Sequence, residues 1–184
     1  MMKRSVWRGS LVALLAGLFL LVYIEGGWIG LSKVRAASEA APMPAARNQP
    51  APAIDLSGLD GKAYHVGGAR SKALIINFWA SWCGPCHDEA PDLERMYSKY
   101  KNELDIYAVN VTKGDQLEEV SKFVKRYGLS FPVLLDQQGS VANKYRLLFV
   151  PTSFLVNKQG ILVDVIHVLP AEELERRIQQ LVKG

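Results

Sequence analysis

Two cysteines separated by Gly-Pro are the residues of this 184-residue chain best suited to chemistry. Cys83 and Cys86 are its only cysteines, and they follow an apolar run, residues 73–79, that is rich in β-branched and aromatic side chains. Such a run is typical of a buried central strand. A pair at this spacing directly after a strand favours a redox-active dithiol. A metal site and an inert structural disulfide are the alternatives that the sequence leaves open.

The residues after Cys86 indicate where the two sulfurs lie in the fold. Apolar side chains recur there at three- and four-residue spacing, as in an amphipathic helix, and they are Leu93, Met96, Tyr97 and Tyr100. Cys83 is therefore expected at a helix N-terminus and Cys86 one turn inside. The free N–H groups and partial positive charge of that terminus favour a thiolate, so we expect Cys83 to be the nucleophile. Cys86 would then attack the mixed disulfide formed at Cys83.

Several motifs resemble those of thioredoxin-fold proteins. They are the segment 78–86 (FWASWCGPC), Pro91 five residues later, and Val150-Pro151-Thr152. The closer resemblance is to the membrane-tethered, extracytoplasmic thiol-disulfide oxidoreductases of the TlpA and ResA type, and it covers roughly residues 52–182. It implies an α/β thioredoxin-like fold with an N-terminal β-hairpin extension, preceded by a transmembrane or signal-anchor helix.

The order of predicted elements fits this fold. Residues 54–66 alternate around Asp60-Gly61, which predicts a β-hairpin. Further strands are expected at 73–79, 104–111 and 132–135, at 148–156 before the turn 157–160, and after that turn. Further helices are expected at 115–127, 140–145 and 172–182. The alternation of strand and helix indicates a βαβ unit with parallel pairing. Residues 53–184 are thus expected to form one thioredoxin-like domain, in which Pro91 should bend the helix that carries the cysteines.

Residues 1–37 carry the features of a membrane segment. They hold five basic residues and one acidic residue, which accounts for the whole net charge of +4, and the run from Gly9 to Ile24 is uncharged and apolar. We expect a retained signal-anchor with its basic end in the cytoplasm, and a cleaved signal peptide is the alternative. Because the rest of the chain has balanced charge, no nucleic-acid partner is expected.

Residues 38–52 are rich in proline and alanine and offer little to bury, so we expect an extended tether. The catalytic domain, 53–184, would then lie on the extracytoplasmic side of the cell membrane, attached by a single span. Disulfides form and persist in that compartment.

Glu89 is the predicted general base. Cytoplasmic thioredoxin has a buried aspartate at the position of Asn77, and an amide cannot accept the proton of the second cysteine. Glu89 lies three residues after Cys86, on the same helix face, and resembles a glutamate that ResA-type proteins keep. We therefore expect Glu89 to deprotonate Cys86, with a raised pKa if it is buried. The alternative is that Asp88 and Glu89 are ordinary acidic residues of a first helical turn.

Three further residues are predicted to bind substrate. By the same resemblance, Pro151 is a cis proline that packs beside the cysteines, and Val150 pairs its backbone with an extended substrate segment. An ordinary strand-edge proline is the alternative at Pro151. Trp82 should cover one side of the nucleophile. His87 is expected to point toward solvent, and His65 to lie at the surface or in a strand.

The resemblance implies a protein-disulfide reductase for exported proteins, such as apocytochrome c in cytochrome c biogenesis, or spore-envelope proteins. Electrons would come from a membrane thiol carrier of the CcdA type. Gly84-Pro85 is the pair found in thioredoxin, whose potential of about −270 mV is strongly reducing. A disulfide oxidase is the enzymatic alternative, and a copper-delivery module with His167 as third ligand is the alternative from another class. No nucleotide loop, haem-attachment pair or zinc cluster appears, so neither a cofactor nor a resident metal is predicted.

Overall fold

The structure is a computed structural model that describes residues 45–184. The predicted membrane segment, 1–37, and the first part of the predicted tether lie outside these residues. Within the described part of the chain, no helix is both long enough and apolar enough to cross a bilayer.

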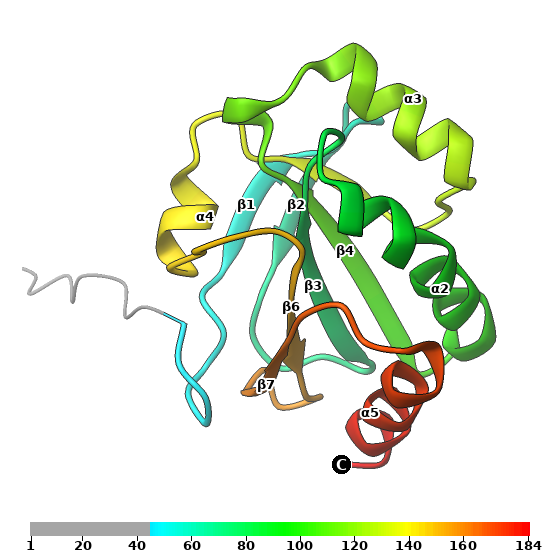
Figure 1. Cartoon of the computed structure of the whole chain (residues 1–184). Helices are drawn as coiled ribbons and strands as arrows, with labels where there is room; N and C mark the ends of the chain where they lie inside the picture. Colours follow the sequence, from blue (N-terminus) through cyan, green and yellow to red (C-terminus); the bar gives the residue numbers. More distant parts are fainter. Residues whose placement is uncertain (1–44) are drawn as a thin grey trace, which may run out of the picture. The chain divides into compact units, whose positions relative to one another are not determined.

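A five-stranded sheet in the order β5-β4-β3-β6-β7 organises the domain (Figure 1). The strands are β3 (Ala73–Trp79), β4 (Leu104–Asn110), β5 (Val133–Leu135), β6 (Thr152–Val156) and β7 (Leu162–Ile166). β3 is parallel to β4 and β4 to β5, whereas β6 runs antiparallel to both β3 and β7. Every residue of the central β3 is buried, which explains its continuous apolar run. This is the α/β architecture that the order of elements predicted.

Helices cover the two faces of the sheet, and the alternation of β3 side chains decides which face packs against which helix. The helices are α2 (Gly84–Tyr100), α3 (Leu117–Tyr127), α4 (Ser140–Lys144) and α5 (Ala171–Lys183), with a short 3-10 helix η1 (Thr112–Gly114). Ile75 and Trp79 join the core formed with α2, α3 and α5, and Leu74 and Phe78 join the core formed with α4. Asn77 has the parity of the α2 face.

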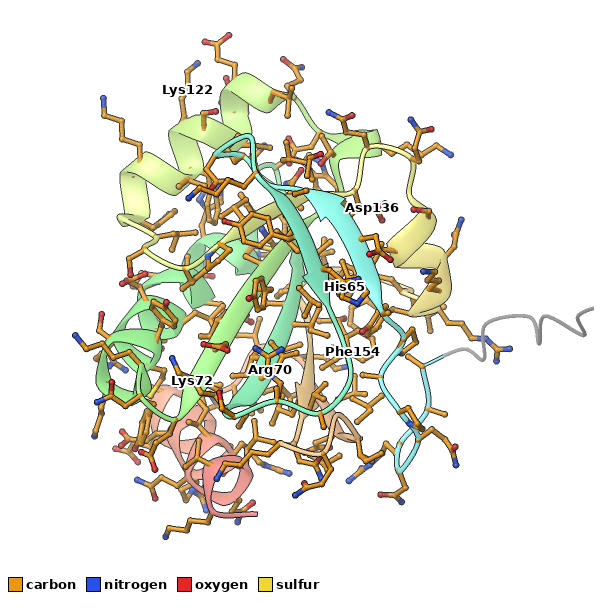
Figure 2. The ribbon with its side chains drawn as sticks, turned by 180° about the vertical axis from the view of Figure 1, so that it is seen from behind. His65, Arg70, Lys72, Lys122, Asp136 and Phe154 are labelled. Atoms are coloured by element: carbon orange, nitrogen blue, oxygen red, sulfur yellow. A yellow bond between two sulfur atoms is a disulfide. The ribbon has the colours of Figure 1, made fainter. Side chains whose placement is uncertain are left out.

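The hairpin strands β1 (Ile54–Ser57) and β2 (Ala63–Val66) pair antiparallel around Asp60-Gly61. Gly61 has φ of 78°, a left-handed conformation that glycine adopts without a steric cost. Seen from behind in Figure 2, this hairpin carries His65 on its outer side. A backbone bond from Leu59 N–H to the Val133 carbonyl, 2.8 Å, joins the hairpin connection to β5.

Residues 45–52, predicted as part of the tether, make backbone hydrogen bonds to the domain. The Asn48 N–H donates to the Leu162 carbonyl at 2.7 Å, and the Leu162 N–H donates to Gln49 at 2.9 Å. The Tyr145 hydroxyl donates to the Pro52 carbonyl at 2.7 Å. These bonds occupy part of the outer edge of β7, which would otherwise offer unpaired backbone groups. Composition did not reveal them because they depend on backbone atoms rather than on apolar side chains.

Candidate active site

Cys83 and Cys86 form a disulfide where β3 ends and α2 begins, with their Cα atoms 5.3 Å apart. Cys83 is the N-cap of α2, and its Sγ accepts a hydrogen bond from the Cys86 N–H at 3.2 Å. Pro85 lies in the first turn, where a missing N–H costs no helical bond. The sulfurs thus have the predicted placement, at the helix N-terminus and inside its first turn. Once the disulfide is reduced, the free N–H groups at the N-terminus of α2, including that of Cys86, stabilise a thiolate on Cys83.

Glu89 is buried, with 8% of its surface exposed, although it is acidic. Its Oε1 accepts a hydrogen bond from Asn77 Nδ2 at 2.7 Å. Burial raises the pKa of Glu89 to about 7; the bond from Asn77 lowers this pKa, and the nearby charge of Asp92 raises it. A carboxyl group with this pKa exists in both protonation states at neutral pH, as a general acid–base catalyst requires.

Asn77 connects three elements of the site. Its Nδ2 donates both to Glu89 on α2 and, at 2.9 Å, to Ser153 Oγ on β6. Ser153 is its direct partner in the antiparallel register of β3 and β6. The sequence identified Asn77 as a residue that cannot accept a proton. The structure adds that it positions the residue that can.

A small cavity of about 10 Å³ joins Cys86, Glu89, Asn77 and Pro151. Its remaining lining is mostly apolar and includes Trp79, Ala90, Leu93, Ala108, Phe123, Leu129 and Phe131. The volume is about the minimum that one water molecule needs, on the order of 10–15 Å³. The Val150–Pro151 peptide bond is cis, as the resemblance implied. The fold therefore brings Cys86 and Glu89, both on α2, together with Pro151, which immediately precedes β6.

Trp82, on the other side of the disulfide, is 63% exposed. Its indole Nε1 donates to the Gly114 carbonyl at 2.8 Å. Trp82 and Val150 line an open, mostly apolar groove of about 430 Å³ together with Val111, Leu147, Leu148 and Phe149. Trp82 and Pro151 do not line the same cavity; Val150, the neighbour of Pro151, connects the two regions.

Sequence reasoning missed Leu148 and Phe149 as surface residues because it placed them in the strand that follows. β6 begins only at Thr152, and these side chains are 89% and 53% exposed. An apolar residue in an exposed loop has the same sequence signal as one in a buried strand.

The prediction that His87 points toward solvent is wrong. Its Nδ1 lies 2.9 Å from the Tyr127 hydroxyl, and its Nε2 lies 2.8 Å from the Ser81 carbonyl. Its ring packs against Phe123 in a tilted arrangement, with the ring centroids 4.7 Å apart. A carbonyl can only accept, so Nε2 carries a proton and, in the neutral ring, the Tyr127 hydroxyl donates to Nδ1. The register of α2 alone could not show that α3 packs against this side of it.

His65 and His167 are both exposed, and neither lines the cavity that holds Cys86. His65 pairs with Asp55 across the hairpin. His167 follows β7, with Nδ1 3.2 Å from Thr152 Oγ1. Its ring packs against Phe149 in a tilted arrangement, with the ring centroids 4.5 Å apart. In residues 45–184, no group of three or more His, Cys, Asp or Glu side chains is placed to hold a metal ion.

Comparisons with a family model and with known proteins agree on the family of this chain. Residues 48–165 match the model of the AhpC/TSA family. The chain is 36% identical over 133 residues to the thiol-disulfide oxidoreductase ResA of Geobacillus kaustophilus (strain HTA426), a match that covers 71% of this chain and 75% of the relative. It is 34% identical over 134 residues to ResA of Bacillus subtilis (strain 168), covering 72% of this chain and 74% of that protein.

A solved structure leads to the same family. The thiol:disulfide interchange protein of the thioredoxin family from Chlorobium tepidum TLS superposes with a TM-score of 0.67 at 26% identity, covering 74% of this chain and 98% of that one. The chain belongs to the AhpC/TSA family and is a thioredoxin-fold thiol-disulfide oxidoreductase of the ResA type.

Proposed function

We propose that this oxidoreductase works as a reductant of disulfides in exported proteins, with Cys83 as nucleophile, Cys86 as resolving thiol and Glu89 as its base. The observation that carries the proposal is Glu89, a buried carboxyl with a pKa near 7 that lines the same cavity as Cys86. A base is needed there because Cys86 is buried in a mostly apolar cavity, and burial disfavours the thiolate form.

The reaction begins from the reduced dithiol. The Cys83 thiolate attacks one sulfur of a substrate disulfide, forming a Cys83–substrate disulfide and releasing the other substrate sulfur as a thiolate. Glu89 then takes the proton of Cys86, whose thiolate attacks Cys83 Sγ and releases the second substrate sulfur. Two electrons and two protons pass to the substrate, and the enzyme is left with the Cys83–Cys86 disulfide.

Substrate docking is proposed at Trp82, Val150 and Pro151. Val150 is only partly buried and lies beside Pro151, at the end of the segment that precedes β6. A substrate strand laid along this backbone would form main-chain hydrogen bonds, while its side chains contact the apolar groove between Trp82 and Phe149. The groove begins at the residue before Cys83, so the residues that flank the reacting substrate cysteine must pass over it.

The cellular setting is part of the same proposal. Residues 1–37 would anchor the enzyme by a single span, with the catalytic domain on the extracytoplasmic side of the cell membrane. Apocytochrome c and spore-envelope proteins are the proposed substrates. Each turnover leaves the enzyme oxidised, so a thiol donor must return two electrons, and a membrane thiol carrier of the CcdA type would supply them.

Equilibration with glutathione tests the direction of the reaction. A reductant should give a reduction potential near that of thioredoxin, about −270 mV, whereas a value near about −120 mV, as in strongly oxidising proteins, would establish the oxidase alternative. Trapping with Cys86→Ser in cells tests the substrates, because this variant cannot release the mixed disulfide. Recovery of apocytochrome c or a spore-envelope protein attached to Cys83 supports the proposal. Capture of only cytoplasmic proteins contradicts it.

A further inference from the structure

The two residues that precede Cys83 are held from three directions. Asp115, which follows η1, accepts hydrogen bonds from both the N–H, at 2.6 Å, and the hydroxyl of Ser81. The Trp82 indole donates to the Gly114 carbonyl at 2.8 Å, and His87 Nε2 donates to the Ser81 carbonyl at 2.8 Å. The segment that presents the nucleophile is therefore fixed by side chains as well as by its connection to β3.

Asp115 is the centre of this arrangement. Besides Ser81, its carboxylate accepts hydrogen bonds from Asn110 Nδ2 at 2.9 Å and from the Gln116 N–H at 2.8 Å. Burial raises the pKa of Asp115, but the hydrogen bonds from Ser81, Asn110 and Gln116 together lower it by more than burial raises it. The pKa of Asp115 therefore lies below its ordinary value. The group is ionised at neutral pH. All of these donors are neutral, so they orient the charge without cancelling it.

This charge lies close to the nucleophile. Ser81 and Cys83 are two residues apart, which limits the distance between their Cα atoms to about 7 Å. Ser81 lies in a turn closed by the Cys83 N–H, which donates to the Ala80 carbonyl at 3.2 Å. The carboxylate that accepts both Ser81 hydrogen bonds is therefore held beside the start of α2. It opposes the effect of the α2 N-terminus, because a negative charge there raises the free energy of a Cys83 thiolate. Only the reduced enzyme can carry that thiolate, so the charge favours the disulfide over the dithiol.

We propose that Asp115 is a positioning residue for the nucleophile, and that its charge makes the dithiol a stronger reductant; this inference rests on the proposed role of Cys83 as nucleophile. The equilibrium with glutathione disulfide measures how strongly the dithiol reduces. In that reaction the dithiol loses two electrons and two protons, and two glutathione thiols form. Asp115 contacts neither sulfur. It acts through Ser81 and through the electrostatic potential at Cys83.

Asp115→Asn removes the charge and keeps the shape of the side chain. The equilibrium with glutathione should shift toward the dithiol by about three- to tenfold, which corresponds to roughly 15–30 mV. The pH at which Cys83 becomes half-reactive toward an alkylating reagent should fall in parallel. The matched control is Glu118→Gln, which removes an exposed charge from the start of α3 and should leave both quantities unchanged. A folded Asp115→Asn protein with the parental equilibrium constant and alkylation profile overturns the electrostatic part of the proposal.

Ser81→Ala tests positioning separately and applies even if Asp115→Asn does not fold. It removes one hydrogen bond but keeps the backbone bond and the charge. The alkylation profile should keep its midpoint, whereas the rate of Cys83 attack on a protein disulfide should fall about threefold, and acrylamide should quench Trp82 fluorescence more strongly. Unchanged attack and unchanged quenching would show that the Asp115–Ser81 contact does not position the nucleophile. A shifted midpoint would show that the hydroxyl, rather than the charge, sets the thiol pKa.

Discussion

The surroundings of Cys86 and of Cys83 differ although one disulfide joins the two residues. Cys86 lines a small, mostly apolar cavity with Glu89, whose carboxyl has only Asn77 as a hydrogen-bond partner in the described chain. The residue before Cys83 is the exposed Trp82, held beside a carboxylate that has several donors. Burial raises the pKa of Glu89, whereas hydrogen bonds lower that of Asp115. The two acids are therefore suited to different tasks, one to exchange a proton and the other to remain charged.

This difference separates the two steps of thiol–disulfide exchange. The open side can meet a protein substrate, and the buried side can activate a thiol that never leaves the enzyme. Substitutions beside Cys83 and substitutions beside Cys86 should therefore affect different steps.

Replacing either cysteine has the largest effect. Cys83→Ser should abolish exchange altogether, whereas Cys86→Ser should still attack a substrate once and then stop as the mixed disulfide. Mass spectrometry after reaction with a disulfide peptide measures both outcomes. If the Cys83→Ser protein accumulated a mixed disulfide on Cys86 as readily as the Cys86→Ser protein does on Cys83, the assigned roles of the two cysteines would be wrong.

Glu89→Gln should leave the attack by Cys83 intact and slow release of the mixed disulfide by about 100-fold at neutral pH, the usual size of a general-base effect. Stopped-flow kinetics with a disulfide peptide resolve the two steps. The defect should shrink as pH rises, because above its own pKa the Cys86 thiol ionises without a base. Asp88→Asn is the control, since Asp88 is exposed and its side chain has no hydrogen-bond or ion-pair partner among residues 45–184. A loss that is equal at every pH would indicate an altered substrate contact instead.

The same substitution should stabilise the oxidised protein at alkaline pH. Folded Glu89 has a raised pKa, so the folded state binds a proton that the unfolded state releases as pH rises from about 4.5 to about 7. Stability is therefore lost over this interval, and the loss is about 3 kcal/mol above it. Urea unfolding should show Glu89→Gln to be more stable than the parent at pH 8 and similar at pH 4. A gain of equal size at both values would mean that ionisation of Glu89 is not the cause.

The smallest effects are expected in the groove. Leu148→Ser should raise KM for a protein substrate about fivefold, the effect of losing roughly 1 kcal/mol of apolar contact, without changing exchange with a small-molecule disulfide. Leu117→Ser is the matched control, because Leu117 is also exposed but does not line the groove. An equal effect of both variants would remove the groove from substrate docking.

Local patterns predicted the elements of the site better than its contacts. The strand at 73–79 has the bounds of β3, and the spacing of Cys86 and Glu89 placed both on one face of α2, which the structure shows to be buried. The partner of Glu89 is Asn77, which lies on another element, 12 positions away. Asp115 contacts Ser81 across 34 positions. Periodicity indicates which face of an element is buried, but the group that meets that face is decided by tertiary packing.

The direct test of the account is a titration of Glu89 in the oxidised protein, followed by carbon NMR of its side-chain carboxyl. A midpoint near pH 7 is predicted, because burial beside Cys86 outweighs the hydrogen bond from Asn77. Asn77→Ala should raise the midpoint further, since it removes the group that favours the charged form. A midpoint near about 4.5, the ordinary value for glutamate, would contradict the assignment of Glu89 as the base that activates Cys86.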